Sequence, residues 1–272
     1  MNFQTKLDSI IDKNNSLVCV GLDSDIEKIP PALQNKQYPL FEFNKAIIDS
    51  TADLVCSYKP NSAFYEALGE SGISQLKMTM EYLQKKYPEV CTILDAKRAD
   101  IGSTNKGYVR FIFDWLGADS VTLHPYLGQE ALQPFLDYKD KGCIILCRTS
   151  NPGAGEFQDL KFDGKPLWQI VAKKVYENWN KNKNCMLVVG ATYPTEMHVI
   201  RSFATEMTFL VPGIGAQGGA VSEAVLAGRN SEGRGLIISS SRAIIFASGN
   251  DDFADAARRE AALLRDHINK YR

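Results

Sequence analysis

The strongest constraint on the fold is a regular alternation of apolar runs with segments of helical periodicity. Each apolar run is short and continuous, which is typical of a parallel strand buried on both faces. Eight such units in 272 residues match a (β/α)8 barrel, which needs roughly 250 residues. We therefore predict one α/β domain, a single (β/α)8 TIM barrel over residues 1–272. The predicted strands are residues 17–23, 54–61, 91–97, 120–125, 143–148, 186–192, 208–213 and 235–242.

The segments between these strands carry apolar residues at helical spacing, and a short polar helix precedes the first strand. The segment from Thr149 to about Gly164 is polar and is expected to be irregular. No linker, composition shift or low-complexity segment divides the chain. The predicted helices are residues 41–53, 71–86, 104–116, 129–138, 166–181, 219–226 and 254–270, with a further helix that has Pro194 in its first turn.

Composition limits the partners that the chain can have. A net charge of −1, with 23% charged residues, gives no broad attraction for nucleic acid or an anionic membrane. No apolar run approaches the ~20 residues of a membrane span, and residues 1–14 show no apolar signal region. The six cysteines lie in or beside predicted strands without a C-x-x-C pair, which favours buried free thiols in the cytoplasm over disulfides or zinc. The three histidines are scattered, so we expect no metal site built on histidine.

Polar residues gather where the predicted strands end, which is the face at which barrel enzymes bind and react. The central stretch is Asp95-x-Lys97-x-x-Asp100. Side chains alternate across a strand, so Asp95 and Lys97 share the inner face, and Asp100 follows at the turn. The spacing predicts an ammonium between two carboxylates, which is a charged proton donor; a structural ion-pair network is the alternative. The other polar strand ends carry Asp23, Lys59, Ser150 and Arg242.

A glycine-rich loop follows the seventh predicted strand and includes Gly215, Gln217 and Gly218. Glycine N–H groups can approach an anion closely and the next helix adds its dipole, so the loop is a candidate phosphate site with Arg242 nearby. A tight turn without a ligand is one alternative. A dinucleotide site is another, because Gly213, Gly215 and Gly218 match G-x-G-x-x-G, but no ribose-binding acid follows ~20 residues later.

Three further residues near these strand ends have simpler interpretations. Gly21 shares the inward face with Asp23, where the lack of a side chain is expected to leave room beneath a ligand. His124 is interpreted as a core or rim histidine and not as a catalyst. Arg148 is interpreted as an ion-pair partner at the barrel edge.

The stretch Asp95-x-Lys97-x-x-Asp100-Ile101-x-x-Thr104 resembles the signature of the orotidine 5′-phosphate decarboxylase family. The resemblance extends from the first strand to the last. The Ser-Asn-Pro-Gly and Gly-Ala-Gln-Gly-Gly segments are similar to the longer bacterial branch of that family. The other matching segments are Gly21-Leu22-Asp23, Tyr58-Lys59-Pro60-Asn61, Thr149-Ser150-Asn151-Pro152-Gly153, Pro212-Gly213-x-Gly215-Ala216-Gln217-Gly218-Gly219 and Arg242.

The resemblance implies decarboxylation of orotidine 5′-phosphate to uridine 5′-phosphate in pyrimidine biosynthesis, without a cofactor, by a homodimer with shared active sites. Lys97 would protonate C6 of the pyrimidine, and Asp95 would hold Lys97 and face the departing carboxylate. Lys59 and Asp23 would bind the ribose hydroxyls. The remaining implied contacts are Ser150 with the pyrimidine, Gln217 and Arg242 with the phosphate, Pro212, Gly215 and Gly218 with the substrate, and Asp100, Ile101 and Thr104 with the site of the neighbouring subunit.

Two other functions remain open. The Asp-x-Lys-x-x-Asp core is shared with sugar-phosphate lyases and decarboxylases of the same barrel group, so the core alone does not fix the substrate. A metal-dependent enzyme of that group would need magnesium. A nucleotide-binding barrel without catalytic activity is the other possibility. The combination of the core with Lys59 and Ser150 favours the decarboxylase.

Overall fold

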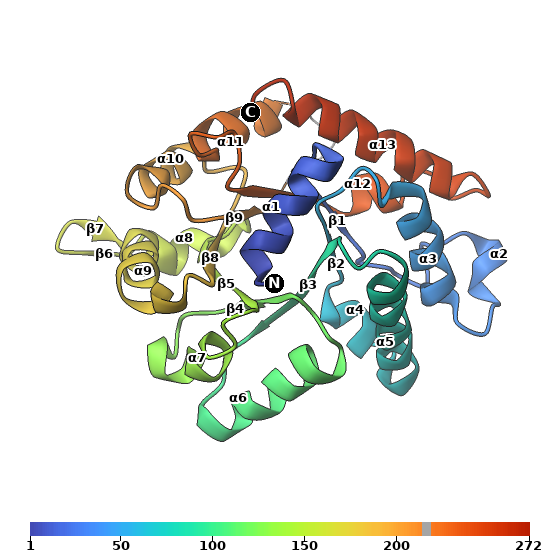
Figure 1. Ribbon diagram of the computed structural model, residues 1–272, viewed down its shortest axis with the longest axis horizontal. Helices are drawn as coiled ribbons and strands as arrows, with labels where there is room; N and C mark the ends of the chain where they lie inside the picture. Colours follow the sequence, from blue (N-terminus) through green and yellow to red (C-terminus); the bar gives the residue numbers. More distant parts are fainter. Residues whose placement is uncertain (214–218) are drawn as a thin grey trace.

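The apolar runs form a closed barrel of parallel strands, which confirms the predicted fold (Figure 1). The computed structural model describes residues 1–213 and 219–272. The barrel strands follow one another in sequence order, and the last pairs with the first through Val18 and Ile238. Within the described residues, the barrel strands are β1 (Val18–Gly21), β2 (Ser57–Lys59), β3 (Cys91–Arg98), β4 (Ser120–Leu123), β5 (Gly142–Arg148), β8 (Cys185–Val189), β9 (Phe209–Val211) and β10 (Leu236–Ser240).

Helices surround the barrel and occupy the predicted segments, with short helices that the periodicity does not predict. The short ones are α2 (Pro31–Gln34), α4 (Ser62–Glu66), α8 (Gly155–Gln158) and α12 (Arg242–Ile245). The longer ones are α1 (Phe3–Asn14), α3 (Pro39–Thr51), α5 (Gly69–Lys86), α6 (Gly102–Val109), α7 (Gly128–Leu136), α9 (Leu167–Lys174), α10 (Pro194–Phe203), α11 (Gly219–Gly228) and α13 (Phe253–Ile268). The π-helical segments Arg110–Trp115 and Val175–Trp179 continue α6 and α9.

Helix α1 lies across the end of the barrel at which the strands begin (Figure 1). Lys6 pairs with Asp119 at 2.8 Å, just before β4 begins. Thr208, just before β9, donates a hydrogen bond of 2.8 Å to Gln4. Because α1 closes this end, a ligand can reach the polar residues only at the opposite end, where the strands finish.

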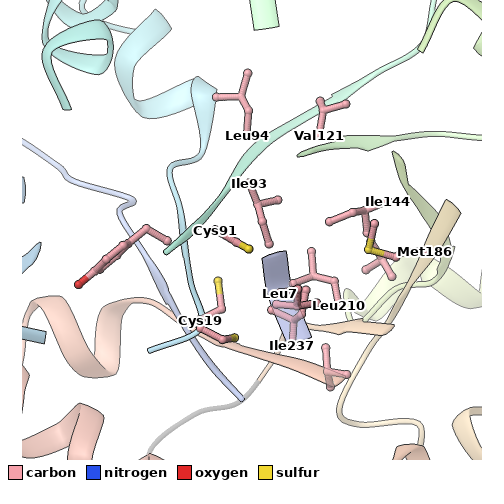
Figure 2. Packing of buried hydrophobic residues seen from close by; sticks show 14 of the residues in the cluster. Leu7, Cys19, Cys91, Ile93, Leu94, Val121, Ile144, Met186, Leu210 and Ile237 are labelled. Carbon is pink, nitrogen blue, oxygen red and sulfur yellow. The ribbon is translucent and has the colours of Figure 1, made fainter. Parts of the chain in front are cut away.

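The barrel interior is packed with apolar side chains and free thiols. Figure 2 shows Leu7 of α1 among inward-facing residues of the strands, including Cys19, Cys91 and Ile237. All six cysteines are free and buried, which confirms the prediction of buried free thiols. Burial raises the pKa of the Cys185 thiol to about 12, so this thiol is protonated at neutral pH and packs as a small apolar group.

The segment after β5 is more ordered than the sequence predicts. It contains α8 and a two-stranded antiparallel hairpin of β6 (Lys161–Phe162) and β7 (Lys165–Pro166). Asp163 and Gly164 have φ values of 50° and 75°, as the tight turn of such a hairpin requires. The expectation of an irregular segment up to Gly164 is therefore wrong, because strands of two residues are too short for alternation to be recognised.

Candidate active site

A row of three charged side chains lies where β2 and β3 end. Lys59 Nζ is 3.0 Å from Asp95 Oδ2, and Lys97 Nζ is 2.6 Å from Asp95 Oδ1. The side chains of Lys59 and Asp95 are buried, whereas that of Lys97 is 50% exposed. The sequence correctly places Asp95 and Lys97 together, because residues two apart on a strand share a face.

The backbone at Lys97 nevertheless departs from a regular strand. The register of β3 against β4 shifts between Leu94 and Arg98, and Lys97 has a φ of 47° in the left-handed region. A non-glycine residue adopts this strained conformation where its surroundings impose it. The Thr122 hydroxyl accepts a hydrogen bond from the Lys97 N–H at 3.0 Å and donates one to Asp95 Oδ1 at 2.8 Å. The sequence does not identify Thr122, because threonine is an ordinary strand residue.

The charges in this row stabilise one another. Burial raises the pKa of the Asp95 carboxyl, but the ammonium groups of Lys59 and Lys97 outweigh burial and hold that pKa well below its usual range. Burial lowers the pKa of Lys59, but the charges of Asp95 and Asp23 outweigh it and raise that pKa above the ordinary lysine value. Asp95 and Lys59 are therefore both charged at neutral pH. Fixed charges of this kind can stabilise charge that develops during a reaction.

Two adjoining cavities open at this end of the barrel and share Lys59, Asp95 and Pro212. Their volumes are about 400 and 460 Å³. The first is partly apolar, and its lining includes Lys97, Ser150, Gln158, Leu146, Val188 and Leu210. The second is polar, and its lining includes Asp23, Ser239, Ser241 and Arg242. A ligand with one apolar and one anionic end could span both.

Asp23 faces the second cavity with an unsatisfied carboxylate oxygen. Its Oδ1 is buried and has no hydrogen-bond partner among the described residues. Such an atom needs a partner from beyond these residues, and a ligand or water in the cavity can supply it. The neighbouring residues are held in place: Tyr65 donates a hydrogen bond of 2.8 Å to the Leu22 carbonyl, and Ser24 donates one to Asn44.

Ser150 rests in a notch formed by two glycines. A Cβ at Gly190 would lie 2.9 Å from the Cβ of Ser150. Gly213, with a φ of 93°, would place a Cβ 3.2 Å from the same atom. The lack of side chains at both positions therefore fixes where Ser150 enters the first cavity.

The structure corrects the interpretation of Gly21. A Cβ at Gly21 would overlap the hydroxyl of Ser241, the residue that precedes α12. The space beside Gly21 is therefore filled by Ser241 and not left beneath a ligand. Gly21 lets the first turn of α12, which begins with Arg242, approach the end of β1.

Residues 16–258 match the model of the orotidine 5′-phosphate decarboxylase / HUMPS family. The chain belongs to this family. An orotidine 5′-phosphate decarboxylase of Cellvibrio japonicus is 51% identical over 99% of this chain and 98% of its own length. One from Ralstonia pickettii is 46% identical over the full length of both.

A solved structure, that of the OMP decarboxylase of Leishmania donovani, matches with a TM-score of 0.86 at 34% identity. It covers 100% of this chain and 98% of its own. The family, the barrel and the enzyme class that the sequence predicts, a carboxy-lyase of pyrimidine biosynthesis, are thereby confirmed.

Part of the family signature lies away from the two cavities of this chain. The Asp100 carboxylate accepts a hydrogen bond of 2.7 Å from the Ile101 N–H, and no ion pair joins it to Lys97 within the described residues. Ile101 is 60% exposed, and Thr104 is also exposed. Within this chain, the Lys97 ammonium therefore contacts one carboxylate, not the two that the spacing predicts.

The other predicted positions are distributed as follows. Asp23, Lys59, Ser150, Pro212 and Arg242 all line the cavities. Arg148 pairs with Asp159 at 3.2 Å, as its interpretation as an ion-pair partner requires. Gly215, Gln217 and Gly218 lie outside the described residues.

Neither a metal-ligand cluster nor a membrane helix is found in the part of the chain that the structure describes. No group of three or more His, Cys, Asp or Glu side chains there is placed to hold a metal ion. No helix there combines the length and apolar character needed to cross a membrane.

Proposed function

We propose that the chain decarboxylates orotidine 5′-phosphate without a cofactor and that Lys97 donates the proton to C6. The observation that carries this proposal is the Lys59–Asp95–Lys97 row at the junction of the two cavities. Lys97 lines only the partly apolar cavity, which suits a pyrimidine ring. Its half-exposed side chain can recover a proton from solvent after each turnover.

The two cavities together suit a nucleoside monophosphate. The ring would occupy the first cavity, against Leu146, Val188 and Leu210, with Ser150 at its polar edge. The phosphate would occupy the second cavity near Arg242, whose guanidinium can bind two phosphate oxygens. The ribose would then lie at the junction.

The ribose hydroxyls would meet Lys59 and the unsatisfied Asp23 Oδ1 at this junction. A hydroxyl can donate to the carboxylate and accept from the ammonium. The proposal also keeps Pro212, which lines both cavities, as a substrate contact. From the resemblance it assigns Gln217 to the phosphate, and Gly215 and Gly218 to the substrate.

The reaction breaks the bond between C6 and the carboxylate. The carboxylate leaves as carbon dioxide, and the electron pair remains on C6 in the plane of the ring. The Lys97 ammonium, held 2.6 Å from Asp95, stabilises this charge and then transfers a proton to C6. Asp95, which stays ionised, faces the substrate carboxylate and repels it, which favours its departure as carbon dioxide. Binding energy from the distant phosphate can offset the unfavourable approach of these two anions.

We further propose a homodimer in which Asp100, Ile101 and Thr104 contribute to the neighbouring site. This is supported by the exposure of a large apolar side chain beside the carboxylate, since Ile101 is 60% exposed. Tyr126 and Leu127, which follow the adjacent strand β4, are 88% and 44% exposed. Exposed apolar side chains near a site suit a protein interface.

We also propose that residues 1–272 act as one catalytic domain in a reducing, cytoplasmic compartment. One buried apolar cluster includes residues from Phe3 in α1 to Ile268 at the end of α13, which supports a single domain. Six free, buried cysteines are compatible with a reducing environment.

The test is the loss of orotidine 5′-phosphate absorbance in the presence of EDTA. The wild-type chain is expected to retain full activity there, whereas a magnesium-dependent enzyme would lose it. Lys97→Ala should reduce kcat on the order of 10³-fold or more, because it removes both the proton donor and a fixed charge.

The matched control is Lys13→Ala at the opposite end of the barrel, where Lys13 pairs with Glu89 on the surface. That variant should keep wild-type activity, because exposed ion pairs contribute little. Near-normal turnover by Lys97→Ala would refute the assigned role.

A further inference from the structure

Gln158 brings the segment that follows β5 into the active site. It is the last residue of α8, and its side chain lines the same cavity as Lys97 and Ser150. Its Oε1 accepts a hydrogen bond of 2.9 Å from the Thr149 N–H, and its Nε2 donates one of 2.8 Å to Thr149 Oγ1. The carboxamide therefore holds the residue before Ser150 through both backbone and side chain.

This hydrogen-bonded chain continues past Ser150. Thr149 Oγ1 donates a hydrogen bond of 2.6 Å to Asn151 Oδ1. The links from Gln158 to Thr149 and from Thr149 to Asn151 thus bracket Ser150. On its other side, Ser150 is confined by Gly190, where a Cβ would lie 2.9 Å away. The position of the Ser150 hydroxyl consequently depends on Gln158.

Gln158 is itself anchored to the barrel by Arg148. The Arg148 guanidinium is buried and lies 3.7 Å from the ring centre of Tyr193. It donates hydrogen bonds to Gln158 Oε1 at 3.4 Å and to Asp159 Oδ2 at 3.2 Å. These contacts fix the Gln158 oxygen and so determine which way its NH2 group points.

The remaining hydrogen-bonding capacity of Gln158 suits a ring carbonyl. A carboxamide has two N–H donors, and one is used by Thr149. The second has no acceptor among the described residues, while the side chain lines a cavity whose other walls include Leu146, Val188 and Leu210. A pyrimidine with carbonyl oxygens provides acceptors that these apolar walls cannot satisfy.

We propose that Gln158 determines specificity for the pyrimidine: it positions Ser150 and donates its second N–H to a ring carbonyl. This inference rests on the proposed function, which places the pyrimidine in the first cavity. Gln158, which lies outside the Asp-x-Lys-x-x-Asp signature, would then recognise the base, while other residues recognise the ribose and the phosphate.

The test compares the dissociation constants of uridine 5′-phosphate and ribose 5-phosphate for four proteins: wild type, Gln158→Ala, Gln158→Glu and Glu156→Gln. Gln158→Ala should weaken binding of uridine 5′-phosphate about tenfold and leave binding of ribose 5-phosphate unchanged, since only the former ligand carries the ring. Gln158→Glu should do the same, because a carboxylate presents no N–H to a carbonyl. Glu156 lies exposed on the same helix, so Glu156→Gln should leave both affinities unchanged.

Equal weakening of both ligands would show that Gln158 only supports the loop, and it would overturn the inference. Unchanged affinity for uridine 5′-phosphate in both Gln158 variants would also overturn it. The proposed function fails separately, if the wild-type protein does not consume orotidine 5′-phosphate. Binding of ribose 5-phosphate by each variant verifies that its barrel is folded.

Discussion

At the residue scale, the site depends on one carboxylate held between two ammonium groups of unequal exposure. The Lys59 side chain is 6% exposed and that of Lys97 is 50% exposed, although both contact Asp95. The Lys59 ammonium is almost fully buried, and its charge helps to keep Asp95 ionised. The half-exposed Lys97 suits the proposed role of proton donor, because solvent can return a proton to it.

Replacing the central carboxylate tests this division. Asp95→Asn leaves the buried Lys59 ammonium without its closest counter-charge, which should lower the free energy of unfolding by about 3–5 kcal/mol. Urea denaturation measures the change. Glu89→Gln, which removes a surface partner of Lys13, is the matched control and should cost about 1 kcal/mol or less. If both variants lose the same small amount of unfolding free energy, Asp95 does not stabilise the buried Lys59 ammonium as argued.

The difference in unfolding free energy between wild type and Asp95→Asn also depends on pH. The pKa of Asp95 is lowered from 3.8, so its contribution to stability is present above pH 3.8 and is lost as the pH falls through the lower folded value. The pKa of Lys59 is raised from 10.5, so its contribution is present below pH 10.5 and is lost above the folded value. The stability difference between wild type and Asp95→Asn should therefore stay constant between these limits and shrink in acid.

The sequence identifies the charged residues of the site but not the groups that hold them. A charge at the end of an apolar run is costly unless it is paired or takes part in function, which makes four residues recognisable: Asp23, Lys59, Asp95 and Lys97. Thr122 carries no such signal, although its hydroxyl fixes Asp95 and the Lys97 backbone. Its role depends on a shift of register between strands, which is a tertiary feature that local sequence does not encode.

At the element scale, the approach of α12 to β1 connects Gly21 to the cavity in which the phosphate is proposed to bind. A Cβ at Gly21 would lie 2.8 Å from the Ser241 Cβ and would overlap its hydroxyl. The Ser241 carbonyl accepts hydrogen bonds from two N–H groups of α12, at 2.9 Å from Ile244 and 3.0 Å from Ile245. Moving Ser241 therefore moves the turn that carries Arg242.

Gly21→Ala should consequently raise the KM for orotidine 5′-phosphate about tenfold, because a charged contact to phosphate is lost or lengthened. Steady-state kinetics measure this effect. The double variant Gly21→Ala/Ser241→Gly removes the overlapping atoms and should restore the KM. Gly249→Ala, where a Cβ would meet nothing within 4 Å, is the control. An unchanged KM in Gly21→Ala would show that α12 tolerates displacement.

The β6–β7 hairpin illustrates where reading elements from the sequence fails. Its strands have two residues each, so hydrophobic alternation has no length over which to appear. The Asp163-Gly164 pair is a signal that could have identified the turn, since Asp-Gly favours positive φ at both central positions. The barrel strands are predicted well for the opposite reason: each is a continuous apolar run between amphipathic helices.

At the scale of the whole molecule, one chain supplies most of the proposed site but leaves Asp100 outside its own cavities. The Asp100 side chain instead bonds the backbone of Ile101, whose apolar side chain points largely into solvent. The family resemblance predicts that Asp100 acts in the neighbouring subunit's site, whereas the local spacing predicts a cluster within one chain. Sequence spacing cannot distinguish the two, because a symmetric dimer brings the same residue to a neighbouring subunit.

Mixing two inactive variants shows whether Asp100 acts in its own subunit's site or in that of its neighbour. Lys97→Ala and Asp100→Asn should each be inactive alone, and Asp100→Asn preserves the oxygen that bonds Ile101. If Asp100 acts across the interface, a mixed dimer contains one site with Lys97 from one subunit and Asp100 from the other, both intact. Random assembly of equal amounts makes half of the dimers mixed, so about a quarter of the wild-type activity should return.

The control for this experiment mixes Lys97→Ala with Asp95→Asn. Asp95 and Lys97 contact each other within one chain at 2.6 Å, so no mixed dimer of these variants contains a complete site and no activity should return. Co-expressed subunits with two different affinity tags allow the mixed dimer to be isolated and assayed directly. An inactive mixed dimer of Lys97→Ala and Asp100→Asn would place Asp100 in the site of its own subunit, reached by a rearrangement of the loop after β3.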